Sequence, residues 1–144
     1  KCQMLYPFIK LDFENFSCQK HYSPAKTYYQ NKLALLMLSL YMRKHWEGIK
    51  VHAIRVTNVK VDMRRYDHLS AFMKNLYKIK SRFSISPEEM AKVYTALSKE
   101  DCYKGFLYDE KWREVKENAH AYDEEEQEKL YFLLEQLIFS RDNY

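Results

Sequence analysis

The sequence predicts an α/β fold with a parallel sheet, and two observations lead to this prediction. A long helix-compatible run over residues 25–46 is followed by Gly48 and then by a strand-compatible run over residues 49–56. Further along the chain a helix, a short strand and a last helix follow in the same alternating order. Such alternation is typical of folds in which helices cover a parallel sheet. We expect a single domain over residues 1–144, with helices packed against the sheet.

The N-terminal segment, residues 1–24, is expected to be an extended loop. Its short apolar stretches are interrupted by Pro7 and followed by a polar stretch that ends at Ser23-Pro24. The run over residues 25–46 contains neither glycine nor proline and is predicted to be the longest helix. Apolar residues recur along it at the spacing of one helix face: Leu33, Leu36, Met37, Leu40 and Tyr41.

The middle of this helix, from Leu33 to Met42, is apolar nearly all round. Leu35, Leu38 and Met42 fill the side opposite the main apolar stripe. A surface helix of a globular protein carries one such stripe, so we expect this segment to be covered on two sides. Two arrangements fit equally well: a position between a sheet and another helix, or one face on a sheet and the other on a second subunit.

Gly48 is predicted to end the helix in a left-handed conformation. The next residues, 49–56, read IKVHAIRV and are rich in β-branched side chains, which predicts a strand. Polar residues 57–65 then follow at the carboxyl end of that strand. In open α/β sheets this is the end at which ligands bind.

The second half of the chain contains three more predicted helices and a strand. Residues 68–79 have helical periodicity, and the sequence Ser86-Pro87-Glu88-Glu89 forms an S-x-x-E capping box with proline at the first helical position. The helix that this box opens is expected to bury Met90, Val93, Tyr94 and Leu97. Residues 105–108 are predicted to be a short strand. Asp123 is predicted to cap a last helix that turns inward Leu130, Leu133, Leu134, Leu137 and Ile138.

Composition argues against several classes of protein. Cys2, Cys18 and Cys102 form no C-x-x-C pair, and the five histidines form no H-E-x-x-H motif, so we assign no metal and no disulfide framework. Widely separated, odd-numbered cysteines fit a reducing cytoplasm. No window approaches the roughly 18 uninterrupted apolar residues of a membrane span.

The charge is unevenly distributed along the sequence. Residues 1–85 hold 16 Lys and Arg against 5 Asp and Glu, a net +11, while residues 86–144 hold 8 against 15, a net −7. A basic half is compatible with nucleic-acid binding. The basic residues are nevertheless spread through every predicted element rather than along one stripe, which favours an ordinary solvated surface.

The residues with the clearest chemical potential are Tyr28 and Lys32. They are four positions apart, which places them one turn apart on one helix face. A phenol is a weak acid at neutral pH unless a nearby cation favours its phenolate, and a lysine one turn away is such a cation. A tyrosine activated in this way can deliver a proton to a carbonyl oxygen or remove one from an alcohol. The Y-x-x-x-K spacing alone is common, but here it opens the long helix that leads into a predicted strand and ligand-side loop.

The segment SPAKTYYQNKLALL, residues 23–36, resembles the active-site helix of short-chain dehydrogenase/reductases, in particular the retinol-dehydrogenase-like branch. The resemblance extends over nearly all of the chain. Other segments are similar to the family's loop after its fifth strand, its sixth strand with the following loop, its next helix start, and its last strand and tail: Lys10 to Phe13, Val51 to Val61, Ser86 to Glu89, and Gly105 to Val115.

The resemblance implies the C-terminal part of a doubly wound Rossmann-type parallel sheet. It implies an NAD(P)-dependent oxidoreductase that interconverts an alcohol and a carbonyl by hydride transfer. Tyr28 matches the proton-transferring tyrosine, and Lys32 matches the lysine that binds the nicotinamide ribose and favours the phenolate. Both residues would therefore be catalytic and would contact the cofactor, NAD or NADP. In this family the helix that carries them commonly forms a homo-oligomer interface.

The chain also departs from the family pattern. No residue matches the serine that polarises the substrate carbonyl, and Val56-Thr57 stand where the family has Pro-Gly. Gly48 and Gly105 are the only glycines, so the glycine-rich turn that cradles nucleotide phosphates is missing from these residues. We therefore expect a fragment that is inactive alone. The alternative is a non-catalytic interaction module that binds a partner through the apolar helix 33–42 and the acidic last helix.

Overall fold

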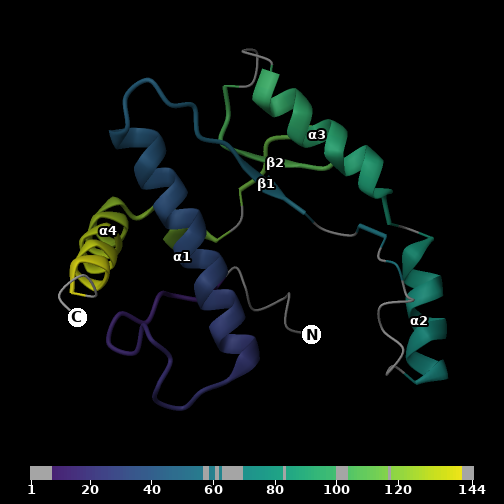
Figure 1. The fold of residues 1–144 in the computed structure, drawn as a ribbon, viewed down its shortest axis with the longest axis horizontal. Coiled ribbons are helices and arrows are strands. Elements are labelled where there is room, and N and C mark those ends of the chain that lie inside the picture. Colours follow the sequence, from purple (N-terminus) through teal and green to yellow (C-terminus); the bar gives the residue numbers. More distant parts are fainter. Residues whose placement is uncertain are drawn as a thin grey trace. The chain divides into compact units, whose positions relative to one another are not determined.

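The structure is a computed structural model (Figure 1). It describes residues 8–56, 59–60, 62, 70–82, 84–99, 104–116 and 118–140. The elements in this part of the chain are, in order, α1 (Pro24–His45), β1 (Ala53–Arg55), α2 (Ala71–Ser81), α3 (Pro87–Lys99), β2 (Leu107–Asp109), the 3-10 helix η4 (Ala119–Tyr122) and α4 (Glu124–Phe139). The protein is thus mixed α/β and mostly helical, as the alternating pattern predicts at this coarse level.

The chain forms two compact units. One consists of Lys1–Ala53 together with Lys116–Tyr144, and the other of Ile54–Val115. The expectation of a single domain over all residues stays a prediction. Of the helices that the structure describes, none has the length and apolar character needed to cross a membrane.

In the first unit, α1 packs against α4 and η4 (Figure 1). The predicted apolar stripe forms the contact side of α1, because Leu33, Leu36 and Met37 are buried. Leu130 of α4 is also buried. The long helix predicted over residues 25–46 is therefore confirmed, and the loop expected before it is confirmed for residues 9–23, which contain neither helix nor strand.

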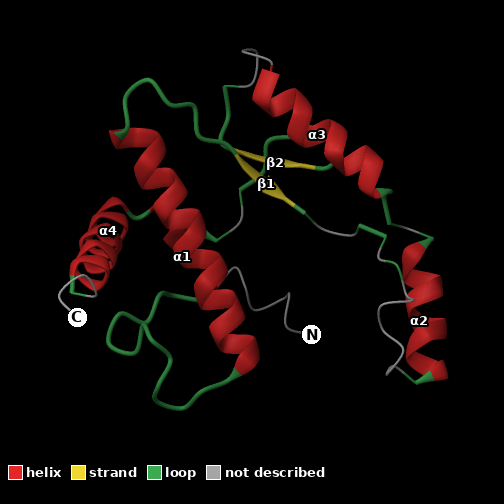
Figure 2. Ribbon diagram, in the orientation of Figure 1, coloured by secondary structure: helices red, strands yellow, loops and turns green. Residues whose placement is uncertain are grey.

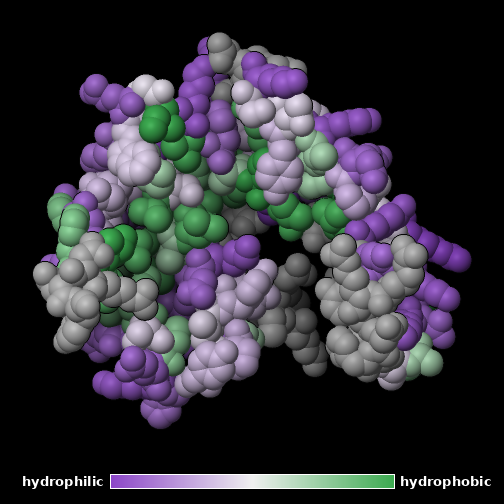
Figure 3. All heavy atoms as spheres, viewed as in Figure 1, coloured by the Kyte–Doolittle hydropathy of each residue, from purple (hydrophilic) through white to green (hydrophobic). Residues whose placement is uncertain are grey.

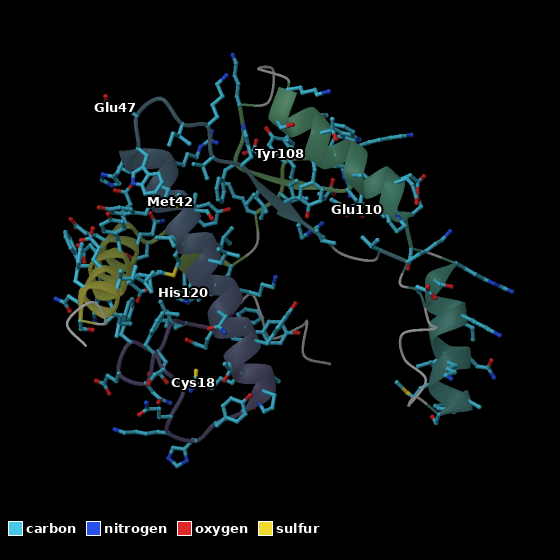
Figure 4. All side chains as sticks on the ribbon, viewed as in Figure 1. Cys18, Met42, Glu47, Tyr108, Glu110 and His120 are labelled. Carbon is cyan, nitrogen blue, oxygen red and sulfur yellow. The ribbon has the colours of Figure 1, made fainter. Side chains whose placement is uncertain are left out.

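The opposite side of α1 is less covered than the sequence led us to expect. Leu35 is 59% exposed, whereas Leu38 and Met42 are half-buried. Figure 4 labels Met42 on this helix. Within the described part of the chain, the side of α1 with Leu35 is only partly packed against other residues. Packing of this side on a second subunit therefore stays a prediction.

The cap of α4 is confirmed, but its apolar side is buried over a shorter length than predicted. The backbone N–H of Glu126 donates to Asp123 Oδ1 at 3.1 Å, which satisfies one of the free amides at the helix start. Burial then decreases along the helix: Gln127 and Leu130 are buried, Leu133 and Leu134 are half-buried, and Leu137 and Ile138 are exposed. The prediction that Leu137 and Ile138 face inward was wrong, because periodicity identifies a helix face but not where its partner ends.

The second unit contains β2 and all of β1 except Ala53, and the two strands form a parallel sheet in the order β1-β2 (Figure 2). Both strands have three residues, and β1 is shorter than the strand predicted over residues 49–56. The pairing partner offers only three residues, so Ile49 and Val56 extend beyond it and are exposed. Residues Met90, Val93 and Leu97 of α3 pack against Tyr108 of β2 and Ile54 of β1.

The predicted capping box of α3 is confirmed in both directions. Glu89 N–H donates to Ser86 Oγ at 3.1 Å, and Ser86 N–H donates to Glu89 Oε2 at 2.7 Å. Two backbone amides that would otherwise lack partners are therefore satisfied. Tyr94 was wrongly assigned to the buried stripe: it is exposed, because it lies about 100° around the helix from Val93.

The segments between β1 and α3 are only partly described. Helix α2 covers residues 71–81 instead of the predicted 68–79, and residues 68 and 69 lie outside the described residues. Most of the loop predicted over 57–65 also lies outside them. Within it, Val59 forms a parallel bridge with Ile85, and Lys60 N–H donates to the Ile85 carbonyl at 2.9 Å.

Gly48 has the left-handed backbone that its position predicted. Helix α1 ends at His45, Trp46 N–H closes the last turn on the Met42 carbonyl, and Gly48 follows with φ of 75°. The glycine therefore turns the chain two residues after the cap instead of forming the cap. A side chain here would be strained although the space around it is open.

Candidate functional site

Tyr28 and Lys32 lie together on α1. The Lys32 ammonium nitrogen is 5.6 Å from the centroid of the Tyr28 ring, within the range of a cation–π contact. Tyr28 is 56% exposed, and Lys32 is exposed as well. The expectation that the two residues share one helix face is confirmed. Their catalytic and cofactor-binding roles stay a prediction.

Gln30 fixes which side of α1 turns outward. Its side chain is buried, its Oε1 accepts from Asp12 N–H at 2.8 Å, and its amide nitrogen donates to the Lys10 carbonyl. Gln30 lies about 200° around the helix from Tyr28. The interactions that hold Gln30 inward therefore hold Tyr28 and Lys32 outward.

Gln30 was not among the site residues predicted from the sequence. A signal was present, because Gln30, Leu33 and Met37 follow the i, i+3, i+7 spacing of a single stripe. A glutamine within an otherwise apolar stripe indicates a buried amide that needs hydrogen-bond partners. Here those partners are the backbone groups of the N-terminal loop, which is tied to the start of α1 in this way.

Tyr29 supports the ring of its neighbour. The rings of Tyr28 and Tyr29 meet edge to face, with centroids 5.2 Å apart and an interplanar angle of 82°. This geometry is favourable for aromatic pairs. Tyr29 is half-buried, whereas Tyr28 is exposed. The two adjacent phenols thus differ in access to solvent. Among the described contacts, the Lys32 ammonium lies over the ring of Tyr28 and not over that of Tyr29.

A small depression lies near this pair, between the N-terminal loop and the start of α1. Its lining includes Asp12, Cys18 and Lys26, but neither Tyr28 nor Lys32. The Lys26 ammonium lies 3.0 Å from Asp12 Oδ2. This hydrogen bond lowers the pKa of Asp12 and outweighs the opposing effect of partial burial. The depression is therefore organised by a local ion pair, and the Tyr28–Lys32 pair stands on the open surface of α1.

The second unit contains a buried carboxylate, Asp109, at the end of β2. Its Oδ1 accepts from the backbone N–H groups of Lys111 and Arg113, at 2.9 and 3.0 Å. Its Oδ2 accepts from Arg113 Nε at 3.0 Å and Nη2 at 2.8 Å, and Arg55 Nη2 lies 3.7 Å away. Figure 4 labels Tyr108 and Glu110, the two neighbours of Asp109. Both oxygens are occupied by donors of the chain, so Asp109 anchors the turn after β2.

Burial of Asp109 raises the pKa of its carboxyl, but the hydrogen bonds from Arg113 and Lys111 outweigh this effect, and the net pKa is lowered from 3.8. A carboxyl whose pKa is lower in the folded state than in the unfolded state stabilises the fold at pH values above the unfolded-state pKa. This stability is lost as pH falls through the folded-state pKa. We expect Asp109→Asn to unfold at lower denaturant concentration at pH 7. The deficit should begin to narrow as pH falls below about 4, where the unfolded parent binds a proton at Asp109, and should narrow further as pH falls through the lowered folded pKa.

Urea titrations of the parent and of Asp109→Asn at both pH values check this prediction. The variant keeps the size of the side chain, so the comparison isolates the charge and its hydrogen bonds. An equal deficit at neutral and acidic pH would show that the second acceptor oxygen, rather than the charge of Asp109, holds the turn.

No family model, no curated protein and no solved structure matches this chain. Across the residues that the structure describes, no group of three or more His, Cys, Asp or Glu side chains could hold a metal ion. The Tyr28–Lys32 pair offers a phenol beside an ammonium group. Such a pair can transfer a proton and can donate hydrogen bonds to an oxygen-rich ligand.

Proposed function

We propose that this chain belongs to an NAD(P)-dependent oxidoreductase of the short-chain dehydrogenase/reductase type, which interconverts an alcohol and a carbonyl. The observation that carries the proposal is the Tyr28–Lys32 pair, one turn apart on the outward side of α1. The resemblance of residues 23–36 to the family's active-site helix adds to it. In this proposal β1 and β2 are the last two strands of a doubly wound Rossmann-type sheet.

Tyr28 is the proton-transferring group in this proposal. Its hydroxyl donates a proton to the substrate oxygen during carbonyl reduction, and its phenolate accepts the proton during alcohol oxidation. The Lys32 ammonium lies one helical turn away, 5.6 Å from the centroid of the Tyr28 ring. The exposure of Tyr28 supports this role, because a substrate oxygen must approach the hydroxyl.

Tyr28 and Lys32 are also the residues that would hold the nicotinamide end of NAD or NADP. A lysine ammonium has three N–H donors, and in the described part of the chain Lys32 forms no ion pair that would occupy them. Ribose hydroxyls are suitable acceptors, so the donor set fits the cofactor. When bound, the nicotinamide supplies or accepts the hydride.

The phosphates of the cofactor need a glycine-rich turn at a helix N-terminus, which these 144 residues do not contain. Cofactor binding and turnover are therefore proposed for a longer protein that supplies this turn. The 144 residues alone are expected to show no saturable binding of NAD(P)H at micromolar concentration. An open reading frame upstream that lacks a glycine-rich strand-turn-helix would overturn the proposal.

The binding role of Lys32 is tested in the full-length protein. Loss of a charged hydrogen-bond donor costs about 1.5–3 kcal/mol, so we expect Lys32→Ala to weaken NAD(P)H binding by roughly one to two orders of magnitude. Fluorescence titration of NAD(P)H measures the dissociation constant. Lys26→Ala is the control, because Lys26 lies on the same helix but pairs with Asp12. Equal affinities for Lys32→Ala and the parent would remove Lys32 from the cofactor site.

The exposed side of α1 favours a second candidate function. Leu35 is 59% exposed although its neighbours Leu38 and Met42 are half-buried. In the oxidoreductase proposal this side forms a homo-oligomer interface. In the alternative it binds another protein, and Tyr28 has no catalytic role.

The variant Leu35→Glu distinguishes the two functions. If this side forms a homo-oligomer, the variant should dissociate it, which size-exclusion chromatography measures. If the chain is monomeric and Tyr28→Phe leaves turnover unchanged, the interaction module is favoured.

A further inference from the structure

Among the residues that the structure describes, none covers the apolar side of helix α2 (Ala71–Ser81). Phe72 is 72% exposed, Ile79 is 61% exposed, and Met73 and Leu76 are exposed as well. Amphipathic helices of soluble domains bury such a side against a core. In the described part of the chain, α2 has no buried residue.

Lys74 and Lys78 lie on the side of α2 away from Phe72, Leu76 and Ile79. At about 100° per residue, Phe72, Leu76 and Ile79 fall within roughly 60° of arc, and Lys74 and Lys78 lie about 200° and 240° around the helix from Phe72. Figure 3 shows hydrophilic atoms along one side of α2, and Figure 4 shows nitrogen-tipped side chains that project from it. The helix is therefore amphipathic with a basic polar side.

The charge of this segment is of one sign. Residues 70–82 contain three lysines and one arginine, Lys74, Lys78, Lys80 and Arg82, and no aspartate or glutamate. By contrast, α3 carries Glu88 and Glu89 in its first turn. The exposed side of this segment matches an apolar partner, and its positive charge matches a negatively charged one. A single surface with both properties would satisfy both sides of the helix.

We propose that α2 binds the surface of a membrane that contains anionic lipids. The helix lies in the plane of the interface, with Phe72, Leu76 and Ile79 inserted toward the acyl chains and the lysines among the head groups. Buried apolar area and attraction to anionic lipid both contribute to such binding. A nucleic acid would match the charge but would leave the apolar side exposed, so the lipid surface is favoured. This inference does not depend on the oxidoreductase proposal.

Co-sedimentation of the full-length protein with vesicles tests the proposal. We expect binding to vesicles of phosphatidylcholine mixed with phosphatidylserine, and at least tenfold weaker binding to phosphatidylcholine alone. Binding should also decrease as salt is raised, because exposed charges are screened. Absence of binding to the mixed vesicles at low salt would overturn the proposal.

Two double variants assign the binding to α2. Phe72→Ser with Ile79→Ser removes apolar contact, and Lys74→Glu with Lys78→Glu reverses two charges; each should reduce binding to the mixed vesicles at least tenfold. Lys92→Glu with Lys99→Glu is the matched control, because both lysines are exposed on α3. Circular dichroism verifies that each variant keeps the helical content of the parent. If the control loses as much binding as the α2 charge variant, general basicity is responsible and the proposal fails.

Other partners would give different results. A self-association site would appear as an oligomer in size-exclusion chromatography that Phe72→Ser with Ile79→Ser dissociates, without vesicle binding. A nucleic-acid site would appear as salt-dependent DNA binding that the Lys74 and Lys78 variant abolishes, again without vesicle binding. Either result overturns membrane binding by α2.

Discussion

In the full-length protein, Tyr28→Phe is expected to lower kcat by about 10²–10⁴-fold, the usual contribution of general acid–base catalysis. The substitution removes one hydroxyl, and Tyr28 is exposed, so no buried hydrogen bond is lost with it. The edge-to-face contact with Tyr29 and the position of Lys32 over the ring depend on the aromatic ring, which phenylalanine retains. Steady-state kinetics with NAD(P)H binding measured in parallel should show lost turnover with retained affinity.

Tyr29→Phe is the matched control for this prediction. Tyr29 lies about 100° around the helix from Tyr28 and is half-buried, so its hydroxyl should not be needed for proton transfer. We expect its turnover to remain close to that of the parent. If Tyr29→Phe abolishes turnover and Tyr28→Phe does not, the correspondence between this chain and the family motif is displaced by one residue.

The largest expected effect on stability is that of Leu33→Ala. Leu33 is fully buried on the side of α1 that faces α4 and η4. Truncation of a buried leucine removes its transfer free energy and leaves a cavity, which together cost about 2–5 kcal/mol. Chemical denaturation followed by circular dichroism measures the change in the free energy of unfolding.

Leu35→Ala is the control for Leu33→Ala, with the same chemical change two residues away. Because Leu35 is largely exposed in the chain by itself, its truncation should change stability by less than about 0.5 kcal/mol. The comparison should be repeated at several protein concentrations. A cost at Leu35 that equals the cost at Leu33 would contradict the packing of α1 described for the single chain. A cost that grows with protein concentration would point to the homo-oligomer.

Local sequence signals located the helices well. The Ser86–Glu89 capping box, the Asp123 cap and the long uninterrupted run of α1 are each confirmed, because they depend on interactions within a few residues. The shared face of Tyr28 and Lys32 follows from the same helical geometry. These features can be predicted from the local sequence whatever segment packs against the helix.

Interactions between distant segments could not be read in this way. The sequence alone did not identify Gln30, which binds the backbone at Lys10 and Asp12, or Asn118, whose side-chain amide donates to the Ile9 carbonyl at 2.6 Å across 109 positions. The 3-10 helix η4 begins beside Asn118 and was not predicted either. Helical spacing can indicate that an amide such as Gln30 is buried, but it cannot name the partners, because these are backbone groups without a side-chain signature.

The sequence by itself determined where the described α-helices form, how two of them are capped, and that Tyr28 and Lys32 lie together on α1. Only the tertiary structure decided how far each apolar face is buried: three residues of β1 form the strand, α4 is buried only in its first half, and the apolar side of α2 is exposed. The physical reason is that capping and periodicity act over one or two turns. Burial depends instead on which distant segment packs against a face and where that segment ends.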